Sequence, residues 1–161
     1  GLQYQWTRKT FGPGLPEAEA WTALQNRHPS LAQHLAPFAD AARKRGDKGE
    51  YWWELRPCDY YEAFNGTKIF WPDLAKYPRF VWDENNTRIG NTGYFTPAVS
   101  PYLLGVLASR VTWFAISRLS QSFGERAGSE RFRLFTQSME RLPIPDAPTA
   151  EREAIGALAL Q

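Results

Sequence analysis

The side chains of this sequence selected as able to do chemistry are ten cations and carboxamides, and seven of them lie between residues 65 and 97. A carboxamide presents a donor beside an acceptor, the pattern that base edges display in the major groove of DNA, and arginine matches guanine in a similar bidentate way. Lysine and arginine also carry the charge that attracts phosphate. The candidate contact residues are Lys68, Lys76, Arg79, Asn85, Asn86, Arg88, Asn91, Arg126, Arg131 and Arg133.

Two roles are predicted for these side chains. We expect Lys68, Lys76 and Arg79 to contact phosphate, which fixes the position of a protein on a duplex without reading its sequence. We expect the other candidates to approach base edges, where sequence is read. All of these side chains should line one continuous concave surface. The sequence therefore predicts a protein that binds double-stranded DNA.

Residues that would support catalysis are missing or wrongly spaced. A metal-dependent nuclease of the PD-(D/E)xK type needs a second acid two residues before a lysine, and PDLAK at residues 72–76 lacks it, so Asp73 is expected to be a turn residue. An adenine methyltransferase needs a glycine-rich cofactor loop and an (N/D)PP(Y/F) motif, and the sequence has neither. His28 and His34 lack the spacing of a metal pair. We expect no catalytic residue and no metal site, and a standalone enzyme is a disfavoured alternative.

Tryptophan suggests a different kind of binding. The chain has Trp 7, Tyr 7 and Phe 10, and exposed rings of this kind can stack on a ligand. A non-catalytic carbohydrate- or protein-binding module would present Trp52, Trp53, Trp71 and Trp82 as a platform. Alternation along strands should hide about half of them, which makes this the second choice.

Length and composition are those of one globular domain. The chain has 161 residues, a formal net charge of +2 and 22% charged residues. Its single cysteine, Cys58, excludes an internal disulfide and fits a reducing cytoplasm. The sequence has no apolar run of about 18 residues, so no membrane span is expected. Because it starts without Met, we expect a fragment of a larger protein.

Three segments with different patterns should position the candidates. In residues 1–50 the pattern predicts an extended segment at 4–11 and a helix that begins at Pro16. It also predicts a second helix that begins at Pro29, is kinked at Pro37 and has Gly46 as its C-cap. Residues 51–99 alternate short aromatic runs with Gly, Pro, Asn and Asp, which indicates several short strands.

Residues 100–161 are predicted to be mainly helical. Ser100 and Pro101 should begin a helix that runs to Leu119, about 30 Å at 1.5 Å per residue. A polar loop follows it, then a short helix or strand at 134–142, and a last helix capped by Thr149.

The order of these features resembles a known family. The markers are YWWEL at 51–55, TKIFWPDLAKYPRFVWD at 67–83, NTGYFTP at 91–97, YLLGVLASRVTWF at 102–114 and RLPIPDAP at 141–148. Together they resemble the TaqI-like C-terminal specificity domain, the target recognition domain of fused restriction-modification enzymes. One departure is visible, because the family's Asn-Ser pair is Ala108 and Ser109 here.

The resemblance implies a fold and a function. It implies an α+β domain in which a β-rich, curled recognition lobe follows the N-terminal helices and a C-terminal helical hairpin packs on it. The chain would recognise a short DNA sequence and position the methyltransferase and nuclease domains of its parent, a type II restriction enzyme with adenine-specific methyltransferase activity. The parent would use S-adenosylmethionine and magnesium, and this fragment would hold neither.

Overall fold

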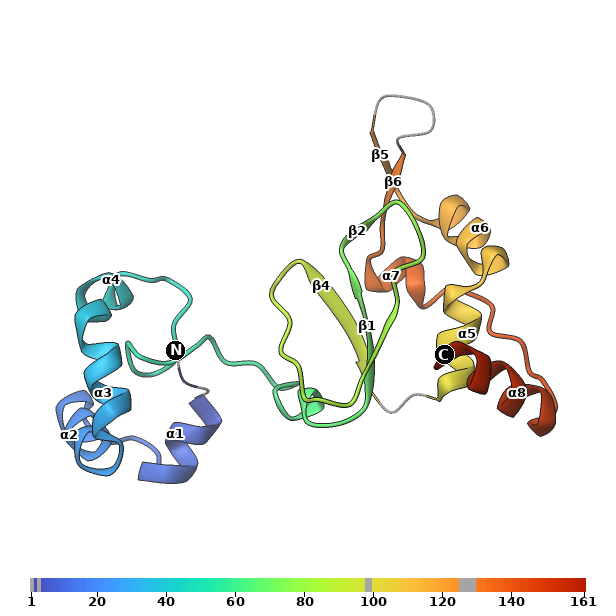
Figure 1. Ribbon diagram of the computed structural model, residues 1–161. Helices are drawn as coiled ribbons and strands as arrows, with labels where there is room; N and C mark the ends of the chain where they lie inside the picture. The colour runs from blue at the N-terminus through green and yellow to red at the C-terminus, as the bar shows by residue number, and fades with distance from the viewer. Residues whose placement is uncertain (1, 3, 98–99, 125–129) are drawn as a thin grey trace. The chain divides into compact units, whose positions relative to one another are not determined.

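The computed structural model describes residues 2, 4–97, 100–124 and 130–161 (Figure 1). The chain divides into two compact units, Gly1–Tyr61 and Glu62–Gln161, each with its own hydrophobic core. The sequence pattern changes at residues 50 and 99, so it did not predict a division at residue 61.

The first unit is built from short helices. These are α1 (Tyr4–Phe11), α2 (Glu17–Arg27), α3 (Pro29–Leu35), the 3-10 helix η1 (Ala36–Phe38) and α4 (Ala39–Arg43). Gly12 and Gly14 have positive φ angles and end α1, while Pro37 lies in the 3-10 turn that separates α3 from α4. The predicted kink at Pro37 is thus confirmed, but the helix ends at Arg43 rather than beside Gly46.

Two predictions for this unit are wrong because tertiary packing overrides local propensity. Residues 4–11 form a helix instead of an extended segment, with Thr7 buried and Trp6 packed on the core. The YWWEL segment at 51–55 is a buried turn and not a regular strand, joined to other segments by single β-bridges. Its aromatic rings, Trp52 and Trp53 among them, pack against Trp21 in the core.

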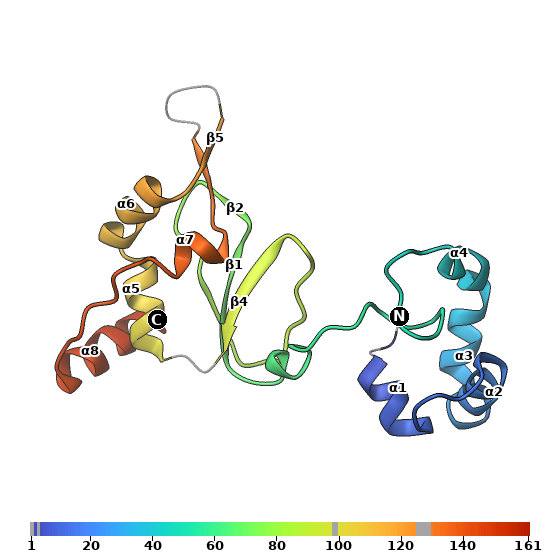
Figure 2. The same cartoon turned by 180° about the vertical axis from the view of Figure 1, so that it is seen from behind.

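The second unit contains two small antiparallel sheets within its described part. The first sheet has the order β3-β1-β4, from β1 (Lys68–Pro72), β3 (Val81–Asp83) and β4 (Gly93–Pro97). The second sheet has the order β2-β6-β5, from β2 (Leu74–Ala75), β5 (Ser122–Phe123) and β6 (Arg131–Arg133). In both views β5 and β6 extend beyond β1 and β4 (Figures 1 and 2).

The α+β class is confirmed, but the curled lobe is not. Neither sheet is closed or strongly curled, because each consists of three strands of at most five residues. Such short ladders cannot accumulate enough twist to wrap around a core. The core lies instead between the sheets and the helices, where Ile69, Trp71, Leu104 and Ile116 pack together.

Helices complete the second unit. They are η2 (Glu62–Phe64), α5 (Pro101–Ala108), α6 (Arg110–Leu119), α7 (Thr136–Met139) and α8 (Thr149–Ala159). Ser100 caps α5 as predicted, since its side chain accepts a hydrogen bond from the Leu103 N–H. Thr149 lies inside α8 and does not cap it, because Pro148 occupies the cap position and has no side-chain oxygen.

The predicted long helix at 101–119 is broken at Ser109. This residue has extended backbone angles, φ −70° and ψ 152°, and its hydroxyl accepts a hydrogen bond from the Thr112 N–H at 3.1 Å. Serine stabilises a helix start in this way, so α6 begins anew with its own cap. The break comes directly after Ala108, the residue that stands where the family named above has asparagine.

Helices α5 and α8 lie side by side (Figures 1 and 2) and make the most extensive helix–helix contact in the described part of this unit. A Cβ atom added to Gly105 would lie 2.7 Å from Ile155 Cγ2, and one added to Gly156 would lie 3.1 Å from Pro101 Cβ. Other elements separate α5 from α8 in the chain, so the expected hairpin of consecutive helices is not what packs here.

We expect Ser109→Ala to lower the free energy of unfolding by about 1 kcal/mol, because α6 loses its N-cap. The measurement is chemical denaturation of the 161-residue chain. Thr149→Ala is the control, because Thr149 is exposed and does not cap α8. Equal stability of Ser109→Ala and the wild type would contradict the cap.

Candidate nucleic-acid interface

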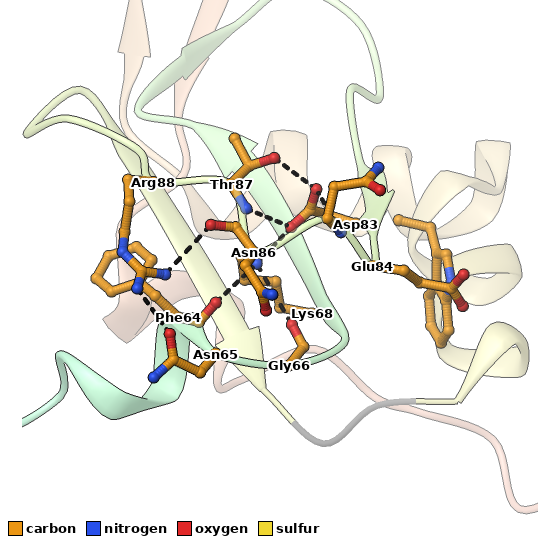
Figure 3. Close-up of polar contacts among 11 residues, drawn as sticks. Phe64, Asn65, Gly66, Lys68, Asp83, Glu84, Asn86, Thr87 and Arg88 are labelled. Atoms are coloured by element: carbon orange, nitrogen blue, oxygen red, sulfur yellow. Dashed lines mark hydrogen bonds and ion pairs between the residues drawn. The ribbon is translucent and has the colours of Figure 1, made fainter.

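A buried ion pair joins two strands at one end of the first sheet (Figure 3). Lys68 on β1 and Asp83 on β3 are Cα partners, and the Lys68 ammonium pairs with Asp83 Oδ2. The same ammonium donates to the carbonyl oxygens of Phe64, at 3.2 Å, and Gly66, at 3.3 Å. An ammonium has three N–H donors, and three acceptors surround this one.

Lys68 therefore cannot serve as the predicted phosphate contact. Its side chain is fully buried, and its charge is already compensated by Asp83. A phosphate could reach it only if the ion pair were broken and the strand moved. The sequence predicted an exposed cation, whereas the structure uses Lys68 as an interior residue.

Asp83 holds the loop that follows it. Its carboxylate accepts hydrogen bonds from the Thr87 hydroxyl at 2.6 Å, from the Thr87 N–H at 3.1 Å and from the Asn85 N–H at 3.4 Å. The Lys68 ammonium and the Thr87 hydroxyl lower the pKa of Asp83 to about 2. Asn86 has a φ of 55°, a left-handed conformation that asparagine tolerates. The 84–88 loop, residues Glu84 to Arg88, is thus fixed from its base.

Arg88 is oriented by neutral partners. Its guanidinium donates to Asn65 Oδ1 at 2.6 Å and to the Asn86 carbonyl oxygen at 3.2 Å, and it lies 5.3 Å from the centre of the Phe64 ring. These bonds use two of its five N–H donors, so others can reach a ligand. Sequence reasoning missed Asn65, although the Asn-Gly pair at 65–66 indicated a turn there.

The predicted carboxamides are at the surface. Asn85, Asn86 and Asn91 are exposed, and their side-chain amides form no hydrogen bond with the described residues. Asn85 and Asn86 belong to the 84–88 loop, while Asn91 precedes β4. Each amide can therefore bind an external donor or acceptor without first leaving a protein partner.

A second group of candidates lies at the other end of β1, where Asp73 joins the two sheets. The Asp73 N–H donates to the Thr92 carbonyl at 2.8 Å, and its own carbonyl accepts from the Leu134 N–H at 2.8 Å. The carboxylate accepts from Arg133 at 3.3 Å. Arg133 is half-buried and lies near the rings of Phe123 and Phe135. These contacts give Arg133 a structural role in the second sheet.

Three exposed cations surround this junction. Ala75 on β2 pairs with Phe132 on β6, so continuing the register by one residue brings Lys76 opposite Arg131. Arg79 follows in the same segment that connects β2 to β3. We name Lys76, Arg79 and Arg131 the basic end. None of the three forms an ion pair with a residue that the structure describes.

The candidates therefore form two groups and not one continuous surface. Lys68 pairs with Asp83 at one end of β1, and Pro72 pairs with Gly93 at the other. At about 3.3 Å per residue, these ends are about 13 Å apart. The 84–88 loop lies at the first end, and the basic end and Asn91 belong to the second. Arg126 lies outside the described residues.

The tryptophan platform is not supported. Trp52, Trp53 and Trp71 are buried, and the Trp71 indole N–H donates to the Leu134 carbonyl at 2.9 Å in the core. Trp82 is half-buried, and its indole N–H donates to the Glu84 carboxylate. The burial of three of these four rings counts against the carbohydrate- or protein-binding alternative, which needs them exposed.

The described part of the chain contains no group of three or more His, Cys, Asp or Glu side chains placed to hold a metal ion. None of its helices has the length and hydrophobicity needed to cross a membrane. Comparison with known proteins gave no matching family model and no matching curated protein.

We expect Lys68→Met to destabilise the protein by far more than about 0.5 kcal/mol, the range of ordinary surface substitutions. Methionine has similar length but leaves the Asp83 carboxylate without its cation. Lys76→Met is the matched control because Lys76 is exposed. Chemical denaturation of both variants measures the difference, and equal stabilities would show that the ion pair is unimportant.

We expect stability to fall as the pH is lowered from about 4 to about 2. Asp83 has a folded pKa of about 2, below its ordinary value of 3.8, so its contribution is present above pH 4 and is lost as the carboxylate is protonated in the folded state. Unfolding of the wild type and Asp83→Asn across this range measures the effect, and the variant should depend less on pH. An NMR titration of the wild-type Asp83 carboxyl with a midpoint near 3.8 would contradict this expectation.

Proposed function

We propose that this chain is a sequence-specific recognition domain for double-stranded DNA. The observation that carries the proposal is the basic end, where Lys76, Arg79 and Arg131 are exposed without an ion pair among the described residues. Uncompensated cations on a folded surface attract phosphate, and counterions are released from the DNA when it binds. The exposed carboxamides of the 84–88 loop add groups that can distinguish bases.

The two groups of candidates contact different parts of the DNA. The basic end contacts the sugar-phosphate backbone, while Asn85, Asn86 and Arg88 approach base edges. Their separation of about 13 Å along β1 is close to the width of the major groove, about 12 Å, so one group can lie at the groove edge while the other enters it. Lys68 and Asp83 contribute indirectly, because they fix the base of the 84–88 loop.

The family resemblance supports a larger context for this proposal. As a TaqI-like specificity domain, the chain would be the recognition part of a larger enzyme. The parent would carry the methyltransferase and nuclease activities, with S-adenosylmethionine and magnesium bound to those other domains. The chain itself then has no catalytic role, and its location is the cytoplasm, where the DNA target lies.

We expect the affinity of the 161-residue chain for a duplex to fall steeply as salt rises, because each phosphate contact contributes a slope of about −0.9 in log affinity against log salt. Lys76→Ala and Arg131→Ala should each reduce the magnitude of that slope by about 1. The target duplex is first selected from a randomised library, and fluorescence anisotropy then gives affinities between 50 and 300 mM salt, a range of about sixfold.

Lys44→Ala provides the control, since Lys44 is an exposed cation of the first unit. It should leave the slope unchanged. The proposal fails if no duplex binds at low salt. It also fails if Lys44→Ala and Arg131→Ala change the slope equally, because the effect would then reflect total charge alone.

We expect Arg88→Ala to reduce discrimination at one base pair of the selected target by roughly 1–3 kcal/mol, the contribution of one bidentate contact. Affinities for all single-base variants of the target, measured with the wild type and Arg88→Ala, test this. Arg79→Ala is the comparison, and it should weaken all variants to the same extent. A uniform loss for Arg88→Ala would assign Arg88 to phosphate.

A further inference from the structure

The solvent side of the second sheet displays an exposed aromatic ring. Phe123 on β5 has 56% of its surface exposed, although phenylalanine is usually buried. Its Cα partner on β6 is Arg131, so both side chains lie on the same face of the ladder. The Arg133 guanidinium lies 5.8 Å from the centre of the same ring.

The opposite face of this sheet is accounted for by the core. Ala75 and Phe132 are Cα partners, Ala75 is buried, and Phe132 packs against the core cluster of the second unit. Side chains alternate between the two faces of a strand, so Arg131 and Arg133 lie on the other face, where Arg131 is exposed and Arg133 is half-buried. Phe123 is therefore placed outward by the register, and burying it would require the whole strand to shift by one residue.

Two cations lie near Phe123 at this sheet. Arg131 on β6 pairs with Phe123 on β5, and the exposed Lys76 follows directly after Ala75, the last residue of β2 and the Cα partner of Phe132. An aromatic ring on a sheet, flanked by cations, is suited to a nucleic-acid strand, because the ring stacks on a base while the cations contact the adjacent phosphates.

We propose that this face binds an unstacked nucleotide, with Phe123 as the stacking platform and Arg131 and Lys76 as the phosphate contacts. The inference rests on the proposed DNA-binding function and adds the class of partner: DNA with at least one base outside the helical stack. A paired base in an undisturbed duplex is stacked on both faces and presents no free surface to Phe123. The partner is therefore a locally opened duplex or a single strand.

The test compares three forms of the selected target: an intact duplex, the same duplex with one unpaired 2-aminopurine, and the single strand with that base. Phe123→Ala should weaken binding of the two forms with a free base by roughly 5- to 150-fold, the effect of losing one base–aromatic stack. The intact duplex should be affected less. Phe123→Trp should restore affinity and quench 2-aminopurine, since it also stacks.

Val111→Ala is the matched control, because Val111 is an apolar residue of α6 with 79% of its surface exposed. It should change none of the three affinities. Circular dichroism and thermal unfolding of each variant establish that the fold is retained. Sedimentation of the wild type and Phe123→Ala tests the other occupant of such a face, a second copy of the chain.

The outcomes separate the inference from the proposed function. If the wild type binds the intact duplex with a steep salt dependence, but Phe123→Ala changes all three affinities equally or not at all, the stacking role is wrong and DNA binding stands. If only the forms with a free base bind, and do so through Phe123, duplex recognition is wrong and the inference stands. A wild-type dimer that Phe123→Ala dissociates would assign the face to self-association and overturn the inference.

Discussion

The ion pair between Lys68 and Asp83 is the interaction on which the polar loops of the second unit depend. It connects β1 to β3, and through the other hydrogen bonds of its two members it also fixes the turn after η2 and the 84–88 loop. Burial of two charges is favourable only when their remaining donors and acceptors are satisfied. Here the ammonium has three acceptors and the carboxylate has three further donors, which meets that condition.

This arrangement separates structural charges from charges that can bind. Lys68 is used inside the protein, and Arg133 is paired with Asp73 at the junction of the sheets. Lys76, Arg79 and Arg131 have no such partner among the described residues. Arg88 is intermediate, since its partners orient it without neutralising it. The binding surface of the protein is thus smaller than its content of basic residues suggests, and it is divided between the two ends of β1.

The second sheet shows how a short element can have two roles. Asp73 links β1 to β2, and its backbone forms hydrogen bonds with the backbone of Thr92 and of Leu134. These bonds anchor the small sheet to the larger one. Its inner face contributes Ala75 and Phe132 to the core, and its outer face carries Arg131 and Phe123. Strands of two or three residues are unstable alone, and this anchoring lets them present functional side chains.

The sequence by itself determined the α+β class, the helix start at Ser100, the interruption at Pro37 and the exposure of Asn85, Asn86 and Asn91. These follow from local rules: proline lacks an N–H, serine caps a helix, and carboxamides in turns face water.

Tertiary structure alone decided that Lys68 is buried, that YWWEL is part of a core and that the 101–119 helix breaks at Ser109. A lysine on an alternating strand looks the same whether it faces water or an aspartate 15 residues away, because the pairing register is set by partners distant in the chain. The number of basic residues is written in the sequence, but which of them remain available depends on where the folded chain places its carboxylates.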